Sequence, residues 1–166
     1  MRYPGIVTLN LVVLTLLSGG CAGKGRMLSP TMVSGGMEAQ QLDLANFIGE
    51  RLHLAATYPS HISRLQLNLI FPEQHKLLAE AHPSIALYGS DGRLLWQHEI
   101  EANQADYVVN RKLSAPTFYA KIGVYYCYEG EQGLCMIQNI LYEVDASDRL
   151  PPGPLKLEYQ LPGSYF

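Results

Sequence analysis

The sequence predicts an all-β protein built as an antiparallel β-sandwich of about seven to eight strands. Short runs of alternating apolar and polar residues are separated by turns at intervals typical of a sandwich. The 166 residues include 15 Gly, 10 Pro and 11 Tyr, which favours short strands and tight turns over a helical bundle. We therefore expect residues 42–166 to form one sandwich of immunoglobulin-like type.

The charge of the chain argues against nucleic acid as a partner. The net charge is -3, the isoelectric point is near 5.9, and Lys and Arg occur singly apart from the pair Arg111-Lys112. A nucleic-acid surface needs clustered basic residues, which this chain lacks.

The amino terminus has the features of a secretory signal. A cationic start at residues 1–5 precedes an apolar run from Ile6 to Leu17, and small residues follow at 18–20. We interpret residues 1–20 as a signal peptide, because the apolar run is too short to span a bilayer comfortably. The small residues before Cys21 resemble the lipobox of bacterial lipoproteins.

The lipobox resemblance implies that the chain is cut before Cys21 and that this cysteine receives acyl chains such as palmitate. Ala22 after the cysteine then suggests the periplasmic face of the outer membrane, with residues 21–41 as a flexible linker. The protein is expected to be tethered to the membrane by lipid without spanning it. The alternative is an ordinary cleaved signal peptide that leaves Cys21 as a free thiol.

The first part of the domain is ambiguous. Residues 41–57 fit either a helical stripe or alternating strands, and we favour two short strands or one strand with a bulge because the following segments are β. The next segment, Arg64–Phe71, alternates cleanly. Leu65, Leu67 and Leu69 share one face, as in a half-buried strand.

The remaining strands follow at short intervals. Pro72 ends the preceding strand, and residues 76–80 are expected to form a single helical turn. An Asp-Gly turn at residues 91–92 predicts a hairpin of Ser84–Tyr88 and Arg93–Trp96. Further strands are predicted at Tyr107–Val109, Thr117–Tyr128, Leu134–Val144 and Leu155–Leu161.

The hairpin of residues 124–141 carries two cysteines. With Cys127 opposite Cys135, the expected cross-strand pairs are Tyr126 with Met136, Val124 with Gln138, Ile122 with Ile140, and Phe118 with Val144. This pairing places an apolar face on the core and the cysteines on the opposite face. Lipidation of Cys21 leaves one cysteine pair, so we expect a Cys127–Cys135 disulfide. The bond constrains the unfolded chain by about 2–3 kcal/mol.

This disulfide has a structural and a redox interpretation. The spacing differs from the Cys-x-x-Cys of thioredoxin-like sites, which favours a structural staple. Exposed cross-strand disulfides can nevertheless be reducible. Use of Cys127 and Cys135 by a periplasmic thiol–disulfide exchange accessory therefore stays open.

Three segments carry a family resemblance: Tyr-Tyr-Cys-Tyr-Glu-Gly-Glu-Gln-Gly-Leu-Cys-Met-Ile at residues 125–137, Leu69–Leu77 and Glu80–Ser84. They resemble the carboxy-terminal β-domain that follows the thioredoxin-like domain and NHL repeats in some multidomain proteins. More weakly, they resemble the amino-terminal immunoglobulin-like domain of transmembrane thiol–disulfide interchange reductases. The resemblance implies a sandwich with a cysteine-bearing hairpin, and the reductases add a redox role as an alternative.

No sequence pattern predicts a catalytic centre. The five histidines lack metal-ligand spacing, and there is no nucleophile elbow, phosphate loop or HExxH helix, so we expect neither a metal nor a cofactor. We expect Tyr125, Tyr128, Lys121 and Trp96 to form a recognition surface, with strand and core packing as the alternative for the aromatic residues. The predicted function is a lipid-anchored, non-enzymatic binding or interaction module with an envelope protein as its partner.

Overall fold

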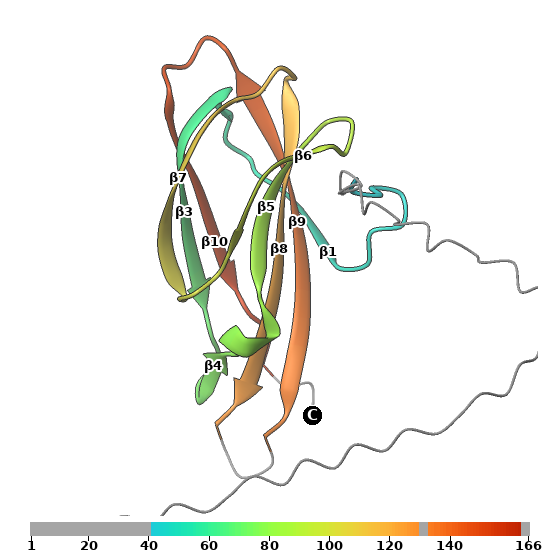
Figure 1. Ribbon diagram of the computed structural model, residues 1–166, viewed down its shortest axis with the longest axis vertical. Helices are drawn as coiled ribbons and strands as arrows, with labels where there is room; N and C mark the ends of the chain where they lie inside the picture. Colours follow the sequence, from blue (N-terminus) through green and yellow to red (C-terminus); the bar gives the residue numbers. More distant parts are fainter. Residues whose placement is uncertain (1–40, 130–132, 164–166) are drawn as a thin grey trace, which may run out of the picture. The chain divides into compact units, whose positions relative to one another are not determined.

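The computed structural model describes residues 41–129 and 133–163, which form a sandwich of two sheets (Figure 1). The larger sheet contains β1 (Glu50–His53), β2 (Tyr58–Pro59), β4 (His75–Leu77), β5 (Ser84–Gly89), β6 (Leu94–Glu99), β8 (Thr117–Tyr128) and β9 (Cys135–Ser147). The smaller sheet contains β3 (His61–Ile70), β7 (Gln104–Lys112) and β10 (Gly153–Gln160). The predicted all-β sandwich is confirmed, whereas the signal peptide, the linker and Cys21 lie outside the described residues.

The strands pair in both directions. The main order in the larger sheet is β1-β9-β8-β5-β6, with β2 also beside β9 and β4 beside β8, and the smaller sheet has the order β10-β3-β7. Strands β1 and β2 run parallel to β9, and β10 runs parallel to β3. The expectation of a purely antiparallel sandwich with seven to eight strands is therefore corrected to ten strands in two mixed sheets. Alternation of side chains is the same in parallel and antiparallel strands, so it could not indicate these pairings.

The segment before β1 is mostly irregular. Only Gln41 forms a bridge, to Arg93, and the expected pair of strands within 41–57 reduces to β1. Gly49 marks the change of direction, with a φ of 152° and a position where a Cβ would lie 2.4 Å from the Asn139 carbonyl oxygen. A side chain is excluded there, and glycine lets the backbone approach β9 closely just before β1 begins to pair with it.

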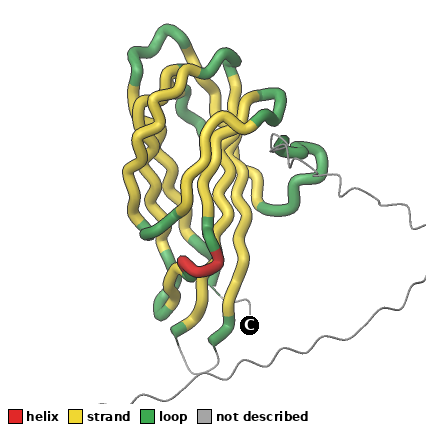
Figure 2. Tube along the Cα trace, viewed as in Figure 1, coloured by secondary structure: helices red, strands yellow, loops and turns green. Residues whose placement is uncertain are grey.

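The two predicted hairpins are present. Strands β5 and β6 pair antiparallel, as do β8 and β9, and Cys127 lies opposite Cys135 with the four predicted neighbouring pairs in register. The single helical turn lies at Ala79–Ala81 (η1), later than expected, because residues 75–77 pair with β8 as strand β4. Figure 2 shows η1 as the one helical turn in the described part of the chain.

The core lies between the sheets and follows the alternation. Leu65, Leu67 and Leu69 of β3 are at most 3% exposed, and Ile122 and Ile140 from the paired strands β8 and β9 are fully buried. Full burial of one such side chain stabilises the fold by about 1.5–3 kcal/mol. Core packing therefore contributes far more than a single disulfide.

Candidate functional site

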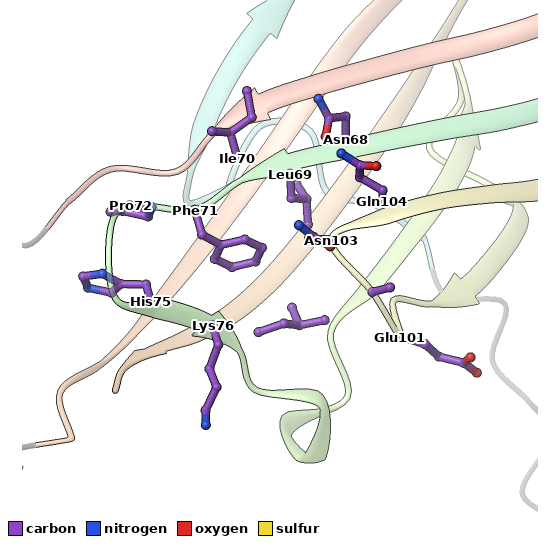
Figure 3. Close-up of a pocket in the computed structure, with 12 residues that line it drawn as sticks. Asn68, Leu69, Ile70, Phe71, Pro72, His75, Lys76, Glu101, Asn103 and Gln104 are labelled. Carbon is purple, nitrogen blue, oxygen red and sulfur yellow. The ribbon is translucent and has the colours of Figure 1, made fainter. Parts of the chain in front are cut away.

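A cleft of about 650 Å³ opens between the end of β3, strand β4 and the loop joining β6 to β7 (Figure 3). Two crossings between the sheets frame it, namely the turn from β3 to β4 and the loop from β6 to β7. The Leu69 amide donates to the Asn103 carbonyl at 2.7 Å and holds that loop against β3. The volume is in the range of clefts that bind ligands.

The floor of the cleft is apolar. Phe71 and Leu77 pack against the core, and the Phe71 ring meets the edge of the Tyr126 ring at a centroid distance of 5.9 Å. In Figure 3 the Phe71 ring points into the cleft, whereas the Lys76 side chain extends away from it. The side chains of Asn103 and Gln104 supply polar groups on the opposite wall. An apolar floor with a few polar groups is typical of a binding cleft.

One wall of the cleft is the unpaired edge of β4. Strand β4 pairs with β8 on its other side: the Leu78 amide donates to the Tyr125 carbonyl at 2.8 Å, and the Glu129 amide donates to the Gln74 carbonyl at 2.7 Å. Backbone groups alternate in direction along an antiparallel strand. The backbone groups of Leu77 therefore point away from β8, on the side of β4 that borders the cleft.

The surroundings of the cleft are acidic. Lys76 pairs with Glu129 at 3.2 Å, and His82 lies 2.9 Å from a Glu99 carboxylate oxygen. Three further carboxylates, Glu73, Glu80 and Glu101, form no ion pair within the described ranges. Glu101 lines the cleft, and the other two flank β4 in the chain. Glu101 is therefore the unpaired carboxylate of the cleft lining, and Lys76, the one Lys or Arg of that lining, is already paired with Glu129.

The predicted recognition surface is not brought together. Lys121 and Tyr125 point outward from the larger sheet, on the face opposite the core. Tyr128 lies on the other face of β8, where its ring meets His75 at 5.4 Å, and Trp96 packs against Tyr107 at 5.8 Å. The reason is the period of two, which places residues 125 and 128 on opposite faces.

Sequence analysis missed the main residues of the cleft. Phe71 and Leu77 lie in the segment Leu69–Leu77 that carries the family resemblance, but nothing in that segment marked them as binding residues, and Glu101 comes from a separate loop. The one available signal was the break after Pro72, which indicated that the strand ended but not what the following residues paired with.

The disulfide lies near the cleft but on the outer face. Cys127 and Cys135 are bonded as predicted, with their Cα atoms 4.0 Å apart. Cys127 is only 9% exposed because it lies between β4 and β9, whereas Cys135 is exposed. Lys76 is the direct cross-strand neighbour of Cys127, so its side chain shares the outer face with the disulfide.

The free edge of β10 is covered by tyrosines. Three hydroxyls donate to carbonyl oxygens of this strand and its end: Tyr58 to Lys156 at 3.3 Å, Tyr142 to Glu158 at 2.8 Å, and Tyr126 to Pro162 at 2.9 Å. Burial, reinforced by the charges of Glu50 and Glu158, raises the pKa of Tyr142 to about 12. The Tyr142 hydroxyl therefore remains a protonated donor over the physiological range.

The described residues contain no group of three or more His, Cys, Asp or Glu arranged to hold a metal ion. Within the same residues, no helix has the length and apolar character needed to cross a membrane. No protein-family model matches this chain, and no curated protein matches it. The family resemblances of the sequence therefore stay predictions.

Proposed function

We propose that this protein is a lipid-anchored cell-envelope protein whose sandwich is a non-enzymatic binding module, with the cleft beside β4 as its binding site. The observation that carries the proposal is the combination of an apolar floor at Phe71 and Leu77 with an unpaired strand edge in one cleft. Such a cleft offers burial for apolar groups and backbone hydrogen bonds for orientation.

The anchor is the acylated Cys21, and residues 21–41 are the tether. The support is the signal-like amino terminus and the small residues before Cys21. Mass spectrometry of protein extracted from membranes should show acyl mass on this cysteine. An unmodified form with a free Cys21 thiol would overturn the anchor but would leave the binding proposal standing.

The cleft is tested by filling it. A photo-reactive amino acid at Asn103 of the full chain should form a defined adduct in the cell envelope, and Ala102→Trp should abolish that adduct because the indole occupies the cleft. The matched control is Ala56→Trp, at an exposed position between β1 and β2. Equal adducts in both variants would show that the cleft is not the binding site.

Thiol–disulfide exchange is a second candidate, favoured by the exposure of Cys135 beside the covered Cys127. A thiolate of an external thiol attacks the Cys135 Sγ, a mixed disulfide forms there, and Cys127 leaves as a thiolate. Lys76 beside Cys127 favours that thiolate.

Reduced glutathione is a suitable probe for this exchange. Mass spectrometry should then map the mixed disulfide to Cys135 and the free thiol to Cys127. An unchanged Cys127–Cys135 bond would exclude the exchange function without affecting the cleft.

A further inference from the structure

We infer that the occupant of the cleft is a short, extended and basic polypeptide segment that adds to the larger sheet as a strand beside β4. This inference rests on the proposed function, which places binding in the cleft. It adds the chemical class of the ligand, the backbone that holds it and the charge that selects it.

The backbone of β4 supplies the first argument. The Gln74 carbonyl and the Leu78 amide are bonded to β8. Because backbone groups alternate in direction along an antiparallel strand, the amide and carbonyl of Leu77 point to the opposite side, where a further strand would lie. The His75 amide, the other donor on this edge, is bonded to the Pro72 carbonyl at 3.2 Å, so Leu77 supplies the amide that the backbone of another strand would meet. Because β4 contains only three residues, the added segment is short.

The floor of the cleft supplies the second argument. Side chains of an added strand alternate between the two faces of the sheet. One set therefore points toward Phe71 and Leu77, which lie on the core side of the cleft, and the other set points toward solvent. The ligand consequently needs an apolar residue at alternate positions, and its remaining positions are free to be polar.

Charge complementarity supplies the third argument. Glu101 lines the cleft, and Glu73 and Glu80 flank β4, with no ion pair to any of them in the part of the chain that the structure describes. Lys76, the one Lys or Arg that lines the cleft, is already paired with Glu129. Lys or Arg side chains at the polar positions of the ligand meet this unpaired negative charge.

The test uses the purified full chain in detergent and a labelled peptide of about eight residues that alternates valine and lysine, a length that exceeds the β4 edge. Fluorescence anisotropy reports binding. Two further peptides carry N-methyl groups on either the odd or the even residues. Since the amides of a strand alternate between its two edges, one methylated peptide should lose binding by at least about tenfold and the other should retain it.

Charge is tested with matched variants. Glu101→Lys should weaken binding of the valine–lysine peptide several-fold, whereas Glu143→Lys, an exposed position on β9 away from the cleft, should leave it unchanged. A peptide alternating valine and glutamate should bind far more weakly than its lysine counterpart.

Three results would overturn the inference. They are no binding of the valine–lysine peptide, equal binding of the two methylated peptides, or equal binding of the glutamate peptide. If Ala102→Trp still abolishes the adduct at Asn103 in the envelope, any of these results leaves the cleft as a binding site with another class of ligand. Loss of the Ala102→Trp effect would instead remove the proposed function itself.

Discussion

The edges of β10 and β4 differ in what meets their backbone. Both strands pair with a neighbour on one side only, β10 with β3 and β4 with β8. Tyr58, Tyr142 and Tyr126 donate hydroxyls to carbonyls along β10 and at its end. Within the described ranges no side chain donates to the backbone of β4. One edge is closed by the protein itself, and the other is left for a ligand.

This difference separates a stabilising edge from a binding edge. An unprotected strand edge is a template for pairing with other chains, so proteins usually block it. Another edge of this sandwich is also blocked at its end, because the Tyr107 hydroxyl donates to the Glu99 carbonyl at 3.3 Å. The β4 edge receives no such donor within the described ranges, and it borders the cleft.

The largest expected effect on stability concerns the Cys127–Cys135 disulfide, which lies beside β4. Replacing both cysteines, as Cys127→Ala with Cys135→Ala, should lower the free energy of unfolding by about 2–3 kcal/mol in urea titrations because the closed loop is lost from the unfolded chain. Hydrogen exchange should show that the amides of β4 and the end of β8 lose more protection than those of β10. Equal loss of amide protection in β4 and β10 would show that the disulfide does not stabilise the β4 region specifically.

A smaller effect should appear at alkaline pH, through β10. The pKa of Tyr142 is raised to about 12 in the fold from about 10 in an unfolded chain. The stabilisation is therefore complete below pH 10 and is lost as the pH rises toward 12, by about 2 kcal/mol. Urea unfolding across this range should show a weaker pH dependence for Tyr142→Phe. An unchanged dependence would assign the alkaline loss to other groups.

The hydroxyl of Tyr142 should also matter at neutral pH. Tyr142→Phe removes the donor to the Glu158 carbonyl from a part-buried bond whose tyrosine is only 2% exposed, and it should cost about 1–2 kcal/mol in the free energy of unfolding. Tyr119→Phe is the control, because Tyr119 lies on the outer face of β8. Equal costs in the two variants would show that the bond to β10 contributes nothing specific.

Local patterns predicted much of this fold. Alternation located β3, and turn residues located the hairpins of β5 with β6 and of β8 with β9. The two cysteines placed the register of β8 and β9 correctly, since a slip by one residue would move every side chain to the other face. These features depend on residues close together in the chain.

Long-range pairing was not predictable in the same way. Leu155 of β10 pairs with Leu65 of β3, and the sequence carries no signal of that choice or of its parallel direction. Tyr58 and Tyr142 cover β10 only because distant strands bring them there. Propensity and period describe a strand but not its partner.

The cleft was harder still to predict. It depends on Phe71 and Leu77 from one segment and on Glu101 from a distant loop, and these meet only once both sheets are assembled. The aromatic residues that looked most suited to recognition, Tyr125 and Tyr128, point to opposite faces of β8. A count of their separation would have excluded a shared face, because three is an odd number.

The smallest expected effect on stability concerns Tyr58, whose hydroxyl bonds to β10 at a more exposed position than the hydroxyl of Tyr142. Tyr58→Phe should cost only about 0.5 kcal/mol in the urea-derived free energy of unfolding. Its hydroxyl donates to Lys156 over 3.3 Å, longer than the 2.8 Å of Tyr142, and Tyr58 is partly exposed. Water can therefore replace the missing donor at Lys156 more readily than at Glu158, where the bond is part-buried and Tyr142 is only 2% exposed. Equal losses of stability in Tyr58→Phe and Tyr142→Phe would show that the burial of the hydroxyl does not set the size of the loss.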